Sequence, residues 1–235
     1  CVDNPMGDTA LYLRGGMNSW NAVEEYKFNY VCDHFELVTE TDGDQSFKIG
    51  DAGWSETSDF GGASSSQVVA ETPLPLALKG SNLSFTFSGV NKLVLDVSKS
   101  TTEPTLTIYQ CPDNPLGETA LFLRGGMNGW TAVSDYLFTY SCDAFYLNVN
   151  ETGEYEFKLA DSGWSAASSF GAADSAANTL THGTPLAITS DALLGASTGN
   201  LKFNFTGAHT AKLTMDADTS NPKLTIGDQT FVGSG

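Results

Sequence analysis

All four tryptophans of this 235-residue chain lie in turn-forming segments, at two matched pairs of positions. The segments read GGMNSW, DAGWS, GGMNGW and DSGWS, and they contain Trp20, Trp54, Trp130 and Trp164. A tryptophan that fills a core normally lies in the middle of a strand. An indole in a turn rich in Gly, Asn and Ser is more often exposed, as a flat apolar plate with one N–H donor. The sequence therefore predicts two pairs of exposed indoles.

Two exposed indoles are suited to binding sugar rings. A pyranose ring has an apolar face of C–H groups and a rim of hydroxyls, so an aromatic plate can stack on the face while a polar side chain contacts the rim. Lys48 and Lys158 precede the second tryptophan of each pair by the same spacing. This combination predicts a sugar-binding platform in each half of the chain. In the alternative interpretation, one tryptophan of each pair is a plug that closes the end of a domain.

The matched positions arise from an internal repeat. Residues 1–61 align on residues 111–171 without a gap and are identical at 34 positions. A unit of about 110 residues is therefore present twice. We expect two domains, over residues 1–110 and 111–235.

The elements that position these side chains are short strands. Segments of four to eight residues alternate apolar and polar side chains, and Gly, Asn, Asp and Pro separate them. Seven or more such strands in each repeat predict an all-β protein with two tandem immunoglobulin-like β-sandwich domains. A short helical turn is expected near residues 189–195, where the second repeat has about eight extra residues. The residues predicted to fill the first core are Leu11, Leu13, Phe28, Phe35, Leu37, Phe47, Ile49, Leu83, Phe85, Phe87, Leu93 and Leu95.

Charge and cysteine spacing indicate where the protein works. The formal net charge is -17, which repels nucleic acid and anionic membrane surfaces, and no apolar run is long enough to span a membrane. Cys1 and Cys32 are 31 residues apart, as are Cys111 and Cys142, so we expect one disulfide within each repeat. Disulfides favour a secreted or cell-surface location. A lipidated Cys1 is the alternative for that residue.

Enzymatic function is not expected. The three histidines do not occupy matching positions, so the duplicated unit has no histidine-based active site. Motifs for a phosphate loop, a zinc site or a serine nucleophile are absent from the sequence. Asp51 and Asp161 match, but a glycosidase needs two carboxylates across a deep cleft. We predict no catalytic residue, no cofactor and no metal.

The stretch TALYLRGGMNSWNAV, followed by a strand pair and SFKIGDAGW, resembles the family-48 carbohydrate-binding modules that bind starch and glycogen, including those of bacterial pullulanases and amylases. The similarity covers about 50 residues of each repeat. Met17 replaces the commoner aromatic residue, the cysteine pair is not a general family feature, and no similarity extends beyond Gly62. The late polar contacts of the family therefore have no assigned counterpart.

The resemblance implies that α-glucan is contacted by two indoles and one lysine in each repeat. These residues are Trp20, Lys48, Trp54, Trp130, Lys158 and Trp164. Asn18 and Asn128 are expected to hold the turn. Arg14 and Arg124 are interpreted either as salt-bridged strand ends, which we favour, or as sugar contacts.

The function predicted from these features is non-catalytic binding of an α-glucan polysaccharide by two weak, linked sites. The main alternative is a structural role, in which disulfide-stapled sandwiches act as spacers or self-assemble outside the cell. The chain is expected to belong to a larger multidomain protein or an extracellular assembly.

Overall fold

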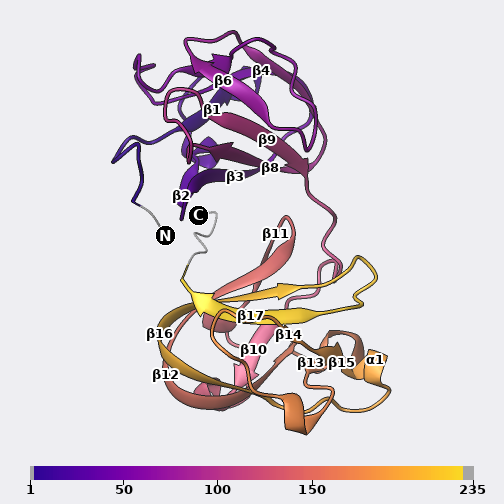
Figure 1. Cartoon of the computed structure of the whole chain (residues 1–235). Helices are drawn as coiled ribbons and strands as arrows, with labels where there is room; N and C mark the ends of the chain where they lie inside the picture. The colour runs from indigo at the N-terminus through magenta and orange to yellow at the C-terminus, as the bar shows by residue number, and fades with distance from the viewer. Residues whose placement is uncertain (1–2, 230–235) are drawn as a thin grey trace. The chain divides into compact units, whose positions relative to one another are not determined.

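The computed structural model describes residues 3–229 and consists of two antiparallel all-β units (Figure 1). The first unit ends at Cys111 and the second begins at Pro112. The strands of the first unit are β1 (Tyr12–Gly15), β2 (Asn29–Val31), β3 (His34–Glu40), β4 (Gly43–Gly50), β5 (Phe60–Gly62), β6 (Leu74–Leu78), β7 (Leu83–Phe87), β8 (Val90–Asp96) and β9 (Thr105–Gln110). Its two 3-10 turns are η1 (Gly16–Asn18) and η2 (Glu24–Tyr26). The prediction of an all-β, two-domain fold is confirmed.

The first unit has two layers that share one strand. One layer contains β1, β4, β5 and β7, and the other contains β2, β3, β8 and β9. Strand β6 pairs with β5 of one layer and with β9 of the other. The two layers therefore join along one edge and enclose the core between them.

The second unit repeats this plan with fewer, longer strands. Its strands are β10 (Phe122–Gly125), β11 (Thr139–Ser141), β12 (Ala144–Ala160), β13 (Phe170–Gly171), β14 (Leu186–Ala187), β15 (Thr189–Ser190), β16 (Leu201–Thr214) and β17 (Lys223–Asp228). Its helical turns are η3 (Gly126–Asn128), η4 (Ser134–Tyr136), η5 (Ala166–Ser168), η6 (Ser175–Ala177) and α1 (Asp191–Leu194). The sheet order is β14-β17-β16-β12-β13-β15, with β10 and β11 also paired to β12.

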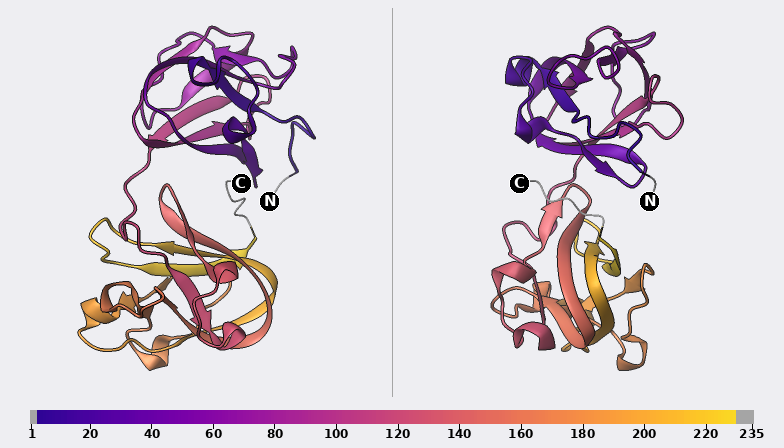
Figure 2. Two further views of the ribbon diagram at one scale, coloured as in Figure 1. Left: turned by 180° about the vertical axis from the view of Figure 1, so that it is seen from behind. Right: turned by 90° about the vertical axis from the view of Figure 1, so that its left-hand side faces the viewer.

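Strands β12 and β16 are longer than the four to eight residues that the sequence predicts. They have 17 and 14 residues and pair along one continuous ladder that curves around the unit (Figure 2). Gly153 and Gly207 have φ of 111° and 125°, so each strand bends at a glycine without losing its pairing. In the first unit the equivalent ladder is interrupted at residues 41–42 and 88–89. The sequence pattern marks a turn in both repeats, but only one repeat breaks the strand there.

The predicted core is confirmed except for Phe85. Each unit has its own cluster of buried apolar side chains between its layers. Of the twelve residues expected in the first core, Phe85 alone is only partly buried, and its ring meets Phe87 edge-on at 4.9 Å. The helical turn expected near residues 189–195 is α1.

The described cysteines are all disulfide-bonded. Cys32, Cys111 and Cys142 each take part in a disulfide. Cys1 lies outside the described residues, so the pairing of cysteines within each repeat stays a prediction. Over residues 3–229, none of the helices has the length and apolar character that crossing a membrane requires.

The first unit contains a histidine whose charge affects its stability. His34 Nε2 lies 2.7 Å from a Glu36 carboxylate oxygen and Nδ1 lies 2.6 Å from Asp33, while Lys92 also pairs with Glu36 at 2.7 Å. The hydrogen bond to Glu36 is the largest cause that raises the pKa of His34, and the bond to Asp33 adds to it. The second repeat has Ala144 at the matching position.

We therefore expect the first unit to lose stability as pH rises. A raised folded-state pKa stabilises fully below the unfolded value of about 6.5, and the stabilisation disappears as pH passes through the folded pKa. Urea unfolding between about pH 5.5 and pH 8.5 measures the effect, with His34→Gln as the variant that lacks it. An equal pH dependence in both proteins would contradict the assignment to His34.

Candidate functional site

The first tryptophan of each pair follows strand β1 or β10 through a tight 3-10 turn. Asn18 holds the turn, because its carbonyl oxygen accepts from Gly15 N at 2.9 Å and its amide donates to Leu13 O at 2.8 Å. A Cβ at Gly15 would lie 2.5 Å from Ser46 O, so only glycine fits against β4 here. Asn128 and Gly125 repeat this arrangement. The expectation that these asparagines hold the turn is confirmed.

The second tryptophan of each pair lies in a turn that an aspartate caps. Asp51 accepts hydrogen bonds from the backbone N–H of Ser55 at 2.7 Å and from its hydroxyl at 2.6 Å. Burial raises the pKa of Asp51, but the hydrogen bonds from Ser55 outweigh it and the pKa is lowered overall. Asp161 and Ser165 make the same contacts in the second unit. These matched carboxylates therefore shape the turn of Trp54 and Trp164.

All four tryptophans adopt left-handed backbone conformations. Their φ values are 64° for Trp20 and Trp130, 54° for Trp54 and 56° for Trp164. Residues other than glycine rarely adopt this region, because Cβ approaches the following carbonyl group. Four strained positions that all bear indoles indicate that the turns are built to present these side chains.

A buried arginine joins the two turns of each site. Arg14 Nε donates to Trp20 O at 2.9 Å, and its Nη1 donates to Asp51 O at 2.5 Å and Ala52 O at 3.2 Å. Its guanidinium carbon lies 3.8 Å from the ring centroid of Trp54. Desolvation by burial lowers the pKa of Arg14. Arg124 makes the equivalent contacts and lies 4.0 Å from the Trp164 ring.

These arginines are not the salt-bridged strand ends that the sequence favoured. Among the described residues, neither forms an ion pair, and the guanidinium donates to backbone carbonyls. The spacing between the two tryptophan turns provides three acceptors within reach of one planar donor. Each arginine therefore positions both indoles and covers one face of the second one.

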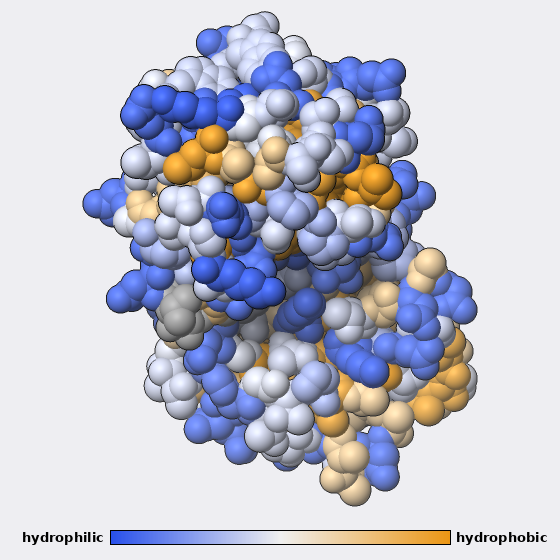
Figure 3. Space-filling model, turned by 45° about the horizontal axis from the view of Figure 1, so that its top comes forward, coloured by the Kyte–Doolittle hydropathy of each residue, from blue (hydrophilic) through white to orange (hydrophobic). Residues whose placement is uncertain are grey.

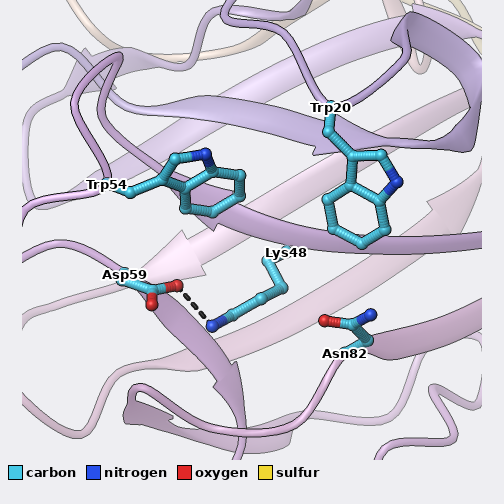
Figure 4. Close-up of a pocket in the computed structure, with 5 residues that line it drawn as sticks. All are labelled: Trp20, Lys48, Trp54, Asp59 and Asn82. Carbon is cyan, nitrogen blue, oxygen red and sulfur yellow. Dashed lines mark ion pairs between the residues drawn. The ribbon is translucent and has the colours of Figure 1, made fainter.

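The structure brings the three predicted residues of each repeat together. In the first unit, Trp20, Lys48 and Trp54 line a pocket of about 310 Å³ with Asp59 and Asn82 (Figure 4). The ring centroids of Trp20 and Trp54 are 6.4 Å apart and their planes are inclined by 43°. None of the four tryptophans belongs to a core cluster: Trp20, Trp54 and Trp130 are half-buried, and Trp164 is 38% exposed.

Lys48 lies between the indoles and is less accessible than a rim lysine. Its side chain is 12% exposed, its ammonium nitrogen lies 5.9 Å from the Trp54 ring centroid, and it pairs with Asp59 (Figure 4). An ammonium group has three donors, so the ion pair leaves donors for a ligand hydroxyl. The exposed Asn82 amide lies across the pocket and has no hydrogen-bond partner among the described residues.

The second site has the same indole spacing but a different carboxylate. Trp130 and Trp164 have ring centroids 6.4 Å apart and planes inclined by 35°. Position 169, which matches Asp59, is a serine, and Lys158 instead pairs with Asp191 of α1 at 3.2 Å. Asn200, which matches Asn82, donates to Glu156 at 3.0 Å. The two sites are therefore similar in their aromatic part and different in their polar part.

Sequence reasoning missed Asp59, Asn82 and Asp191. The matching segments NLSF and NLKF could have identified Asn82, because this asparagine is kept in both repeats. Asp59 is not kept and Asp191 lies in the extra segment, so the repeat gives no signal for either. Within residues 3–229, no group of three His, Cys, Asp or Glu side chains is placed to hold a metal ion.

Comparisons with known proteins give two structural neighbours. No protein-family model and no curated protein matches the chain. AmyP-SBD, a starch-binding domain in a ligand-induced structure, is 16% identical with a TM-score of 0.37, over 47% of this chain and 72% of that one. SusF from Bacteroides thetaiotaomicron, a starch-binding protein, is 15% identical with a TM-score of 0.38, over 94% of this chain and 49% of that one. Because these TM-scores are low, the function proposed below is inferred from the residues of the two sites.

One glycine controls how deeply an indole lies in the first site. A Cβ at Gly50 would lie 2.9 Å from Cε3 of Trp54, whereas the second unit has Ala160 at this position and a more exposed indole, Trp164. We expect Gly50→Ala to push Trp54 outward and to weaken ligand binding at the first site about threefold to tenfold. Ala160→Gly is the matched reverse change. Tryptophan fluorescence and calorimetry report the two effects, and unchanged values in Gly50→Ala would show that the ring has room to spare.

Proposed function

We propose that the protein binds an α-glucan of the starch or glycogen type, without catalysis, through the two indole pairs. The observation that supports this most directly is the pair of inclined indoles 6.4 Å apart in each unit, with a lysine beside them. One face of the second indole in each pair lies against an arginine, so the other face is available to a sugar ring.

The inclination of the rings favours a curved polysaccharide. Planes at 43° and 35° cannot both lie flat on a straight, ribbon-like chain. An α-1,4-linked chain bends from one glucose to the next, so successive rings can stack on indoles of different orientation. The lysine, and Asn82 in the first site, then contact hydroxyls at the ring edges.

The affinity of one site is expected to be low. Each stacked ring contributes about 1 to 2 kcal/mol, by analogy with other aromatic contacts. Two stacked rings with a few hydrogen bonds correspond to a Kd on the order of 10 μM to 1 mM. Two sites that bind one polymer raise the apparent affinity by about 10², because the second contact becomes intramolecular. This accounts for the duplication of the unit.

The remaining features of the proposal follow from the polymer. A polysaccharide of this size lies outside the cell for a secreted or surface protein, which agrees with disulfide-bonded cysteines. The binding role places the chain beside other domains of a larger protein or within an extracellular assembly.

Gel retardation in amylopectin, glycogen, pullulan and cellulose tests this function. We expect retardation in the α-glucans and none in cellulose. Maltoheptaose should also shift the tryptophan fluorescence of the protein. The absence of any response to every α-glucan would contradict glucan binding and favour the structural role as a spacer.

A further inference from the structure

The second site has an element that the first site lacks. Gly61 and Asn82 are 21 residues apart, whereas the matching Gly171 and Asn200 are 29 apart, so eight residues are added. The added segment forms β15 and α1, and α1 packs on η5, which begins two residues after Trp164. The insertion therefore lies directly beside the second indole pair.

Helix α1 is held firmly to the binding site. Asp191 Oδ1 accepts from Thr198 N and from Thr198 Oγ1, each at 2.8 Å, and from Lys158 Nζ at 3.2 Å. The backbone N–H of Asp191 donates to Ser169 O at 2.9 Å. Lys158 Nζ is in turn 5.8 Å from the Trp164 ring centroid. One carboxylate thus connects the start of α1 to the lysine of the site.

The other end of α1 presents apolar side chains to solvent. Leu193 is 53% exposed and Leu194 is 40% exposed, next to an indole that is itself 38% exposed. The edge of the second unit where Figure 1 places α1 has an apolar patch in Figure 3. Two neighbouring exposed leucines have a cost in solubility that a single one lacks, and such patches mark binding surfaces.

We propose that Leu193 and Leu194 form an additional subsite that extends the second glucan site beyond Trp164. This inference rests on the proposed function. A glucose that follows the ring on Trp164 has an apolar C–H face that the leucines can cover, while its hydroxyls reach toward Lys158 and Asp191. The occupant is the same glucan chain, because the leucines are continuous with the indole and are fixed to the lysine of the site. The second site then binds a longer stretch of glucan than the first.

Single-site variants measure the subsite. Trp20→Ala with Trp54→Ala leaves only the second site, and Trp130→Ala with Trp164→Ala leaves only the first. Calorimetry with maltose through maltoheptaose gives Kd as a function of chain length. We expect the Kd of the second site to improve by a further factor of about three to ten beyond the length at which the first site reaches its plateau.

Leu193→Ser with Leu194→Ser should remove this further gain from the second site and leave binding of maltose unchanged. Both leucines are exposed, so the change leaves the core intact. Val69→Ser, at a 59% exposed position of the first unit, is the matched control and should change nothing. Equal length dependence of the two sites, or a serine variant that keeps the gain, would overturn the subsite. So would a serine variant that loses self-association alone, since the leucines would then contact a second copy. Failure of both single-site proteins to bind any glucan would instead refute the proposed function itself.

Discussion

Replacing Trp54 and Trp164 with alanine in one chain is expected to abolish retardation by amylopectin. Each substitution removes one of the two stacking surfaces of its site, and a site with one indole retains about 1 to 2 kcal/mol of stacking. Replacing only one of the two should reduce the apparent affinity for amylopectin by about 10², because bivalent binding is lost. Affinity electrophoresis measures both effects.

Short ligands separate loss of a site from loss of bivalency. In either single variant, the Kd of the intact site for maltoheptaose should equal that of the same site in the wild-type protein, because this ligand does not need both sites. Neither indole belongs to a core cluster, so the urea midpoint serves as the folding control. A single variant that binds amylopectin as tightly as the wild type would contradict bivalent binding.

Replacing Arg14 with alanine is expected to damage the first site and its unit together. The substitution removes the donor of three backbone carbonyls and the group that lies against Trp54. Unsatisfied buried acceptors should lower the free energy of unfolding by about 2 to 4 kcal/mol. Loss of the defined indole spacing should weaken maltoheptaose binding at the first site about tenfold or more.

Arg14→Lys distinguishes positioning from charge. A lysine keeps the positive charge but lacks the planar fork that reaches both turns, so we expect it to restore little of the affinity. Measurements in the background without Trp130 and Trp164 isolate the first site, and Arg124 leaves the second unit as an internal folding reference. Normal binding by a folded Arg14→Ala protein would show that the indoles hold their positions without the arginine.

The sequence contains most of the aromatic site because the repeat marks it twice. Tryptophans, turn glycines and the asparagine of each turn recur at an offset of 110 residues, and their local hydrogen bonds are the same in both units. The strand pattern likewise predicts which apolar residues fill the core, since alternation along a strand decides which face is buried.

The polar part of the site could not be predicted in this way. The partner of Lys48 is 11 residues further along the chain, whereas that of Lys158 is 33 residues away on an inserted helix. Only the fold brings these carboxylates to the same place. The role of Arg14 also depends on two turns that are distant in sequence and close in space, so its type alone suggested an ion pair.

The left-handed backbone of the four tryptophans has a consequence for how the protein would change without its ligand. Such a conformation costs about 1 to 2 kcal/mol for a residue with a Cβ and almost nothing for glycine. Under selection for heat resistance alone, glycine should therefore replace tryptophan at these positions sooner than at ordinary surface sites. Lineages that keep all four indoles would reveal continued use of the polysaccharide, and drift to glycine in one unit would reveal that this unit has become a passive scaffold.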